Sequence, residues 1–323
     1  MVEVFRTEPL NMEFVVKNIV DGIAKYVEDN HLKCCVIGLS GGIDSTVCAA
    51  LCKMAKVPLI GVSLPSTTNE SVEKSAAALA GEEFCDAFKE VSIDSMFTAM
   101  KNFCDHSVSE KESTPISQGN IKARLRMITL YDIASKSNGI VIGTSNKTEW
   151  LTGFWTLHGD VGDLNPIGEL WKTEVYALAN YLKDKVFKGS KALSNSIALI
   201  PTDGNGVKSG GDAEQIMPGY TYKEIDHVLS KWDGLSDKIK PKYAADGLTE
   251  SIKNTIFDIE DEEVKKRRMD ACEKAKKEFV PNLGDLYSVD SVRKVCMRSW
   301  NSEFKRKNLE LCININDGKV LLH

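Results

Sequence analysis

Residues 39–46, Leu-Ser-Gly-Gly-Ile-Asp-Ser-Thr, bring two glycines, three hydroxyls and one carboxylate into a single short turn. An apolar run over 34–39 leads into this turn, and a helical pattern begins near Asp44. Glycines let the backbone approach an anion closely, and the first N–H groups of a helix carry partial positive charge. The turn therefore predicts phosphate binding, although it lacks the lysine of the GxxxxGK[ST] loop. An ordinary turn with capping hydroxyls is the alternative.

A second apolar run, 139–143, also ends in a turn rich in hydroxyls, which begins with Thr144 and reaches Glu149. In doubly wound sheets, ligands bind outside the carboxyl ends of the strands where the strand order reverses. If the two runs are neighbouring strands at that point, Asp44 and Glu149 face one cleft. Two carboxylates beside a phosphate suit Mg²⁺, which prefers oxygen ligands. Each carboxylate taken alone is more simply explained as a surface or capping group.

Strand-like and helix-like segments alternate over the first 190 residues, and this alternation has to position both turns. The alternation predicts an α/β fold with a doubly wound parallel sheet flanked by helices on both faces. The short strands are rich in Val, Ile and Leu, as strands buried on both faces should be. Strands are predicted at 34–39, 57–63, 88–93 and 139–143, and helices at 12–29, 44–55, 69–81, 94–105, 117–137 and 170–184.

The pattern weakens after residue 185. Residues 201–222 are polar and rich in glycine, which predicts a loop, and residues 223–280 have a helical pattern with mixed charge. We expect a single domain over residues 1–323, with an α/β core at about 30–190 and a loop and helical C-terminal portion at about 200–323. The apolar face of the helix at 12–29 packs either on this core or on a partner.

Composition narrows the class of protein. The chain has 323 residues and a formal net charge of −5, which gives no electrostatic reason to expect a nucleic-acid partner. No apolar run approaches the length of a membrane span, and the first residues do not resemble a secretory signal. Nine cysteines without a CxxC pair are typical of reduced thiols in a cytoplasmic protein. The five histidines show no metal-ligand spacing.

The six residues Ser-Gly-Gly-Ile-Asp-Ser at 40–45 resemble the pyrophosphate loop of the N-type ATP pyrophosphatases. That superfamily includes the synthetases of NAD, GMP, asparagine and argininosuccinate, and the loop alone does not choose among them. Further segments do choose, because together they are similar to NAD synthetase over roughly residues 10–310. These segments are 120–127, 143–149, 153–160, 165–179, 201–204, 219–226 and 302–306.

The resemblance implies a reaction that makes NAD from nicotinic acid adenine dinucleotide, ATP and ammonia. The nicotinate carboxylate attacks the α-phosphate of ATP and expels pyrophosphate, and ammonia then displaces AMP from the acyl adenylate. Many relatives carry an N-terminal glutaminase domain that supplies ammonia. Here the pyrophosphate loop begins at residue 40, so the resemblance implies the ammonia-dependent form, with no glutaminase domain. It also implies a homodimer.

The resemblance assigns ATP to both turns and to three later segments. Lys172 should reach the phosphates, since a lysine near the beginning of a helix is disfavoured unless an anion compensates it. An exposed helix lysine is the alternative. The implied catalytic residues are Asp44, Lys172 and Asp160, and the implied Mg²⁺ ligands are Asp44 and Glu149. The implied ATP-binding residues are Ser40, Gly41, Gly42, Ile43, Asp44, Ser45, Thr144, Lys172, Thr202, Lys305 and Arg306.

The dinucleotide is assigned to two other segments. Asn120 and Arg124 share one helix face, although a helix salt bridge is the alternative and Arg126 competes with Arg124 for the role. Phe154 and Trp155 form either an aromatic wall for the nicotinate ring or ordinary core. Asp160 should bind ammonium and take its proton, because the free amine is the nucleophile. The implied substrate-binding residues are thus Asn120, Arg124, Phe154, Trp155 and Asp160.

Several positions depart from the family pattern. Ser145 stands where many relatives have Asp, Asn69 where Gln is frequent, and Phe304 where His is common. An acidic pair usual before residues 219–226 is Glu214-Gln215 here. These departures concern nucleotide contacts and loop closure rather than the reaction.

Three other functions compete with the synthetase interpretation. A core like that of GMP synthetase should show its own C-terminal dimerisation sequence, which we do not find. A tRNA-modifying enzyme should carry a basic surface, which the net charge of −5 disfavours. A non-catalytic ATP sensor would have no need to keep Asp44 and Glu149 together with Lys172.

Overall fold

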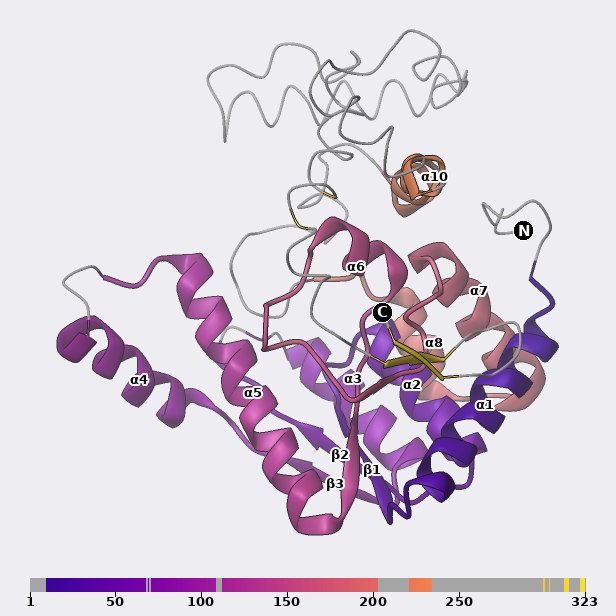
Figure 1. Cartoon of the computed structure of the whole chain (residues 1–323), viewed down its shortest axis with the longest axis horizontal. Coiled ribbons are helices and arrows are strands. Elements are labelled where there is room, and N and C mark those ends of the chain that lie inside the picture. The colour runs from indigo at the N-terminus through magenta and orange to yellow at the C-terminus, as the bar shows by residue number, and fades with distance from the viewer. Residues whose placement is uncertain are drawn as a thin grey trace, which may run out of the picture.

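One seven-stranded sheet organises the protein, as the computed structural model in Figure 1 shows. Its strands are β1 (Cys34–Gly38), β2 (Leu59–Ser63), β3 (Ala87–Glu90), β4 (Gly139–Ile142), β5 (Leu164–Asn165), β6 (Leu311–Ile313) and β7 (Val320–Leu322). They lie in the order β3-β2-β1-β4-β5-β6-β7, and every pair is parallel except β6 and β7. The structure describes residues 10–67, 69, 71–108, 112–202, 221–233, 299, 302, 311–313 and 320–322.

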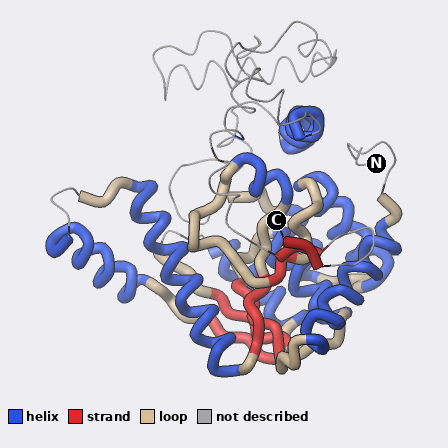
Figure 2. The backbone as a smooth tube through the Cα atoms, viewed as in Figure 1, coloured by secondary structure: helices blue, strands red, loops and turns tan. Residues whose placement is uncertain are grey.

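Helices cover both faces of this sheet, so the predicted doubly wound α/β fold is confirmed (Figure 2). The helices are α1 (Met12–Asp29), α2 (Ile43–Met54), α3 (Ser71–Phe84), α4 (Asp94–Phe103), α5 (Pro115–Ser137), α6 (Lys147–Thr152), α7 (Lys172–Tyr181), α8 (Lys191–Ala198) and α10 (Tyr222–Asp233). Short π-helical turns, Cys104–Val108 and Leu182–Val186, extend α4 and α7. Within the described residues, none of the helices combines the length and the apolar character that a membrane crossing requires.

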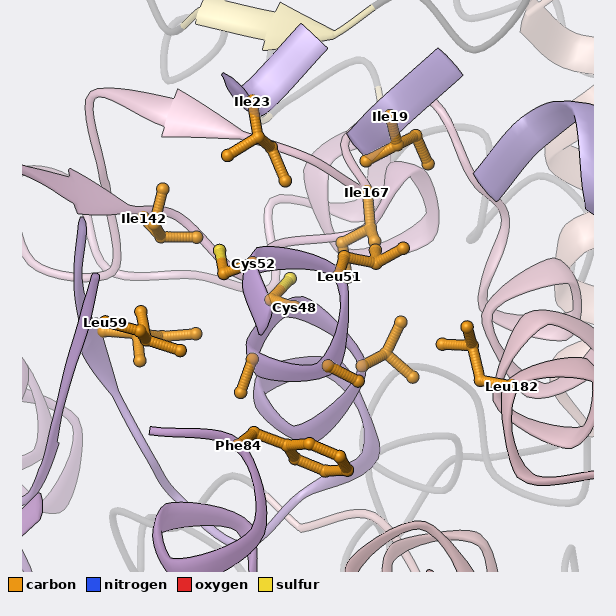
Figure 3. Packing of buried hydrophobic residues seen from close by; sticks show 14 of the residues in the cluster. Ile19, Ile23, Cys48, Leu51, Cys52, Leu59, Phe84, Ile142, Ile167 and Leu182 are labelled. Carbon is orange, nitrogen blue, oxygen red and sulfur yellow. The ribbon is translucent and has the colours of Figure 1, made fainter. Parts of the chain in front are cut away.

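Alternation along β1 explains the two layers. Cys35 and Ile37 point into the large core under α1, α2, α3, α7 and α8, whereas Cys34 and Val36 point to the opposite face, under α5. Successive side chains of a strand face opposite sides of its sheet, so both faces of β1 need cover. Figure 3 shows the larger core around α2, with Leu51 in the same cluster as Ile19 of α1, Ile142 of β4 and Leu182 of the turn that follows α7.

Helix α1 belongs to this chain's own core. Its buried residues Val15, Val16, Ile19, Ile23 and Val27 all join the large cluster. The side chain of Asn11 caps the helix by accepting the N–H of Phe14 at 3.2 Å. The prediction left open whether this face packs on the core or on a partner, and the structure places it on the core.

The shortest elements are the ones that the sequence did not predict. Helices α6 and α8 and strand β5 were missed, as were β6 and β7 in the portion expected to be helical. Strands of two or three residues are too short for a periodic pattern, and their identity depends on pairing with distant strands. Helix α10 begins at Tyr222, one residue before the stretch predicted to be helical at 223–280, and otherwise lies within it. Residues 234–280 and most of the predicted loop at 201–222 lie outside the described residues.

Candidate active site

The two polar turns meet at the point where the strand order reverses. From β1 the chain proceeds outward to β2 and β3, then returns through α4 and α5 to β4 on the other side of β1. Because β1 and β4 are parallel neighbours, their carboxyl ends open on the same edge. The amide of Asn146, in the second turn, donates to Asp44 Oδ1 of the first at 3.0 Å. The prediction that the two turns lie side by side is therefore confirmed.

The first turn is built on a glycine in the left-handed region. Gly41 has φ of 86°, and a Cβ there would lie 2.3 Å from the carbonyl oxygen of Glu73 in α3. The turn is further tied together by hydroxyls, since Ser45 Oγ donates to the Gly42 carbonyl at 3.1 Å and the Gly42 N–H donates to Ser40 Oγ at 3.2 Å. Ser40 is exposed and lies three residues before α2, which begins at Ile43. The turn thus places a helix N-terminus, which attracts anions, at the carboxyl end of β1.

Ile43 contributes differently from its neighbours in the turn. Its side chain is 2% exposed and belongs to the large core, so it anchors the first turn of α2 from below. The neighbouring Asp44 is partly exposed, and its carboxylate accepts from Asn146 and Lys172.

Lys172 lies at the centre of the site. It is the first residue of α7 and is 1% exposed, and its ammonium contacts Asp44 Oδ2 and lies 3.3 Å from Glu149 Oε1. The ring of Tyr222 in α10 lies 5.4 Å from the same nitrogen. A lysine is unfavourable both when buried and at a helix N-terminus, and the two carboxylates offset both costs. The alternative of an exposed helix lysine is thus wrong.

Glu149 has two separate tasks. Its Oε2 accepts the N–H of Asn146 at 3.2 Å while Asn146 Oδ1 accepts the N–H of Glu149 at 3.0 Å, which makes a reciprocal cap on α6. Its Oε1 faces Lys172. One oxygen therefore fixes the rotamer, and the other is presented to the site.

The donor set fits a hard divalent cation only together with a ligand. Asp44 and Glu149 both accept from one ammonium, so their oxygens converge on a single cationic centre. Within the described ranges, no three His, Cys, Asp or Glu side chains gather where they could share a metal ion. Mg²⁺ is commonly held by one or two carboxylates plus substrate phosphates, and two carboxylates beside a phosphate loop match that pattern.

A second group of polar residues joins α5 to the loop at 153–160. Asp160 is exposed, and its Oδ2 accepts the N–H of Thr156 at 2.7 Å. The hydroxyl of Thr156 donates to Asn120 Oδ1 at 2.9 Å. Ser145, where relatives often have Asp, donates from Oγ to the carbonyl of Asp160 at 3.4 Å. The structure therefore links two predicted substrate residues, Asn120 and Asp160, to the second turn.

The two arginines of α5 have different surroundings. Arg126 donates from Nε to the Leu64 carbonyl at 2.8 Å and from Nη2 to Asn69 Oδ1 at 3.4 Å, and burial lowers its pKa. It therefore braces the chain that follows β2. Arg124 is exposed and donates from Nη2 to the Leu157 carbonyl at 3.1 Å. Arg124 therefore lies beside the 153–160 loop, whereas Arg126 lies beside the chain that follows β2.

The two predicted aromatic residues also differ. Trp155 is 7% exposed and stacks on Trp150 with ring centroids 5.0 Å apart and planes at 4°, as core aromatics do. Phe154 is half-buried. Trp155 therefore packs as a core aromatic, and Phe154, beside it in the chain, is the more exposed of the two rings.

The structure describes only some of the remaining predicted residues. Thr144 is half-buried at the carboxyl end of β4, and exposed Thr202 donates to Glu73 Oε1 at 2.5 Å, beside the carbonyl that packs on Gly41. Asn69 receives the N–H of Ser66 at 2.9 Å and so orders the chain after β2. Lys305, Arg306, Glu214, Gln215 and Phe304 lie outside the described residues.

Sequence reasoning missed two groups that shape the site. Asn146 is fully buried and bridges the turns, and its position three residues before Glu149 is a capping signature that was open to recognition. Asp226 of α10 is fully buried against Thr148 and Thr173. Nothing local distinguishes this carboxylate from its charged neighbours in the sequence.

Comparison with known proteins follows the same lines. The family model described as NAD synthase matches residues 15–270. The NH(3)-dependent NAD(+) synthetase of Wolinella succinogenes is 35% identical over 223 residues, which cover 68% of this chain and 79% of that protein. The protein of the same name from Helicobacter pylori is 36% identical over 222 residues, covering 67% and 78%.

Solved structures share the fold. NMN synthetase from Francisella tularensis superimposes with a TM-score of 0.61 and 27% identity, covering 85% of this chain and all of that one. The NH3-dependent NAD synthetase from Campylobacter jejuni gives a TM-score of 0.56 with 28% identity, covering 86% and 100%. Both the extent of the family match and the identity to curated relatives select the synthetase interpretation over its alternatives. The chain belongs to the NAD synthase family, an enzyme family of ligases.

Proposed function

We propose that this protein is an ammonia-dependent NAD synthetase, which amidates nicotinic acid adenine dinucleotide with ATP and ammonia and releases AMP and pyrophosphate. The observation that carries the proposal is the burial of Lys172 between Asp44 and Glu149 at the mouth of a glycine turn. A cation and two carboxylates beside open helix N–H groups suit a triphosphate bound with a divalent ion. The family match supports the same reaction.

At the ATP end, the protein's part is binding and charge neutralisation. The N–H groups of the first turn, with Ser40 and Ser45, cradle the triphosphate, and Thr144 and Thr202 extend the contact. Asp44 and Glu149 would hold Mg²⁺, which would supply positive charge beside the triphosphate when bound. Lys172 leaves its carboxylate partners in part and donates to phosphate oxygen. Lys305 and Arg306 are proposed to reach ATP from the C-terminal side.

At the dinucleotide end, Asn120 and Arg124 hold the substrate and Phe154 packs on the nicotinate ring. The nicotinate carboxylate attacks the α-phosphorus, a P–O bond forms, and the bond to pyrophosphate breaks. Ammonia then attacks the acyl carbon and AMP leaves with the electron pair of the acyl–oxygen bond. Asp160 binds ammonium and accepts one proton from it, which generates the nucleophile.

We further propose a homodimer formed through α4 and α5. These helices project from the sheet on one side, as Figure 1 shows. No residue of α4 is buried, although the helix has an apolar face. Exposed large apolar side chains on the two helices are Met96, Met100, Phe103, Ile116 and Ile128. A monomer rarely leaves so many apolar side chains together in water. Sedimentation of the wild type and of Phe103→Glu tests this, and a wild-type monomer would contradict it.

A cytoplasmic location is proposed from the thiols. Six cysteines between residues 34 and 104 have free thiols, namely Cys34, Cys35, Cys48, Cys52, Cys85 and Cys104. Burial raises the pKa of the Cys48 thiol, so it stays protonated and inert. Free thiols in number are typical of a reducing compartment. The net charge of −5 gives no support to a nucleic-acid partner.

The reaction is tested with purified protein, Mg-ATP, an ammonium salt and nicotinic acid adenine dinucleotide. NAD, AMP and pyrophosphate should appear in equal amounts. A parallel reaction with nicotinic acid mononucleotide is included because one similar solved structure is an NMN synthetase. Faster turnover of the mononucleotide, or hydrolysis of ATP without an amide product, would overturn the proposal.

A further inference from the structure

Asp226 is a fully buried carboxylate on α10 that the proposed reaction does not use. It accepts three hydrogen bonds: from the hydroxyl of Thr148 at 2.5 Å, and from the N–H and the hydroxyl of Thr173 at 3.0 and 2.8 Å. Thr148 comes from α6 and Thr173 from α7. Burying a carboxylate is unfavourable, so three donors converging on one indicate a function for it.

These hydrogen bonds form a closed ring with the backbone of Lys172. The hydroxyl of Thr148 gives its single proton to Asp226, and the same oxygen accepts the N–H of Lys172 at 2.9 Å. Thr173 follows Lys172 directly in the chain and returns to Asp226. The carboxylate therefore ties the start of α7 to the start of α6 through bonds that solvent does not reach, since every member of the ring is buried.

Both ends of the ring are next to site residues. Thr148 precedes Glu149, and Thr173 follows Lys172. The side chains of Glu149 and Lys172 then meet at 3.3 Å on the open side. A change in the separation of Thr148 and Thr173 consequently changes the separation of Glu149 and Lys172.

Helix α10 reaches Lys172 by a second contact as well. Tyr222 and Asp226 are four residues apart, so they lie on one helix face, and the Tyr222 ring lies 5.4 Å from the Lys172 ammonium. Ile225 and Leu229 are fully buried and hold the helix in place. One face of α10 is thus connected to Lys172 in two ways. Asp226 is linked to the backbone N–H of Lys172 through Thr148, and the ring of Tyr222 faces the Lys172 ammonium.

We propose that Asp226 is a positioning residue that sets the spacing between Lys172 and Glu149, and thereby the geometry in which the triphosphate is held. It touches neither ATP nor the acyl group. This inference rests on the proposed function where it is tested by kcat. The shift in Tm caused by Mg-ATP tests it separately, so failure of the inference can be told from failure of the proposed function.

The decisive variant is Asp226→Asn, with Asp233→Asn as the matched control. The amide keeps the volume of the carboxylate but presents an N–H₂ group where Thr148 or Thr173 donates. Asp233 lies on the same helix and pairs with Lys147 of α6 at 2.8 Å, outside the ring. We expect Asp226→Asn to lower kcat about 10- to 100-fold per folded molecule, as small displacements of catalytic groups do. The KM for the dinucleotide should stay within about twofold. Asp233→Asn should behave as wild type.

The hydroxyl of Thr148 offers a rescue test that does not depend on the folding of Asp226→Asn. Thr148→Val removes the hydroxyl and should reproduce the loss of kcat, whereas Thr148→Ser keeps it and should restore most of the activity. If the two residues act as one unit, the double variant Asp226→Asn with Thr148→Val should be little worse than either single variant.

Three results would overturn the inference. The first is a wild-type kcat in both Asp226→Asn and Thr148→Val when these variants are folded. The second is a loss of kcat in Asp233→Asn equal to the loss in Asp226→Asn. The third is a double variant whose loss of kcat is the full sum, in free energy, of the two single losses. If the wild type makes no amide, the proposed function fails, and the shift in Tm caused by Mg-ATP tests Asp226 instead. We then expect Mg-ATP to raise the Tm of Asp226→Asn by less than it raises the Tm of Asp233→Asn. Equal shifts in Tm in the two variants would refute the inference, and so would a wild type whose Tm does not change with Mg-ATP.

Discussion

The two ends of the candidate site are built in opposite ways. At the ATP end, Lys172 is 1% exposed, and the side chains of its partners Asp44 and Glu149 are 16% and 14% exposed. At the dinucleotide end, Arg124 and Asp160 are exposed and are held mainly by backbone groups of one loop. Charges interact far more strongly away from water, so we expect the contacts among Lys172, Asp44 and Glu149 to hold the first set in place before any ligand arrives. The second set is screened by water until a substrate covers it.

This difference indicates where each kind of variant should act. Changes at the ATP end should alter both stability and kcat, because buried charges support each other and the reaction. Changes at the dinucleotide end should alter KM and leave stability nearly unchanged.

The largest effect is expected for Lys172→Met, which leaves two carboxylates facing each other without their cation. We expect kcat to fall about 10³-fold, since one preorganised charge at a transferring phosphoryl group contributes on that order. The matched control is Lys191→Met, because Lys191 also begins a helix but is exposed. Steady-state rates and Tm measure both. Activity of Lys172→Met within tenfold of the control would contradict the preorganised ATP end.

A strong but smaller effect is expected for Gly41→Ala. Gly41 and Gly189 have nearly the same φ, 86° and 83°, but only at Gly41 would a Cβ meet backbone, 2.3 Å from the Glu73 carbonyl. Gly189→Ala should therefore cost only the left-handed strain, about 1–2 kcal/mol. Gly41→Ala should cost more and should also abolish the rise in Tm with Mg-ATP. Denaturant unfolding measures the difference, and equal costs would show that the turn moves freely away from α3.

The dinucleotide end is tested by Arg124→Ala against Arg126→Ala. Arg124→Ala should raise the KM for the dinucleotide about 10- to 100-fold with little change in Tm, since the residue is exposed. Arg126→Ala should lower Tm by several degrees, because it removes donors from Leu64 and Asn69. Initial rates and calorimetry separate the two effects. The reverse pattern would assign the substrate contact to Arg126.

The parts of the fold and of the candidate site that could be predicted are those whose sequence pattern is local. The turns at Asp44 and Glu149 follow short, strongly apolar strands, so their types and order could be inferred from the sequence alone. Their shared edge could be inferred only on the condition that the two strands are neighbours, which the pairing of β1 with β4 confirms. The choice between Arg124 and Arg126 could not, because it depends on which arginine the chain after β2 engages. Strands β6 and β7 and the ring around Asp226 depend on contacts between residues tens of positions apart, which leave no periodic trace.

The last predicted effect concerns stability and pH. Burial raises the pKa of Asp226 to about 7, with Glu174 adding to the increase and hydrogen bonds from Thr148 and Thr173 opposing it. The unfolded value is near 3.9, so between about pH 4 and pH 7 the folded protein binds more protons than the unfolded chain. The free energy of unfolding should therefore fall as pH rises through this range and level off above it. Other charged groups on the helices packed against α10 are Lys147, Glu149 and Lys172.

The difference in stability between wild type and Asp226→Asn isolates Asp226 from these neighbouring charges, so that difference is the quantity to measure. Urea unfolding at several pH values from 5 to 8 should show the wild type losing stability relative to the variant. One proton limits the slope to at most about 1.4 kcal/mol per pH unit. The difference should be flat above the pKa, where Asp226 is charged in both states. A wild type that gains stability relative to the variant as pH rises would mean that the three donors outweigh burial, and that the ATP end is held by a carboxylate ionised throughout this range.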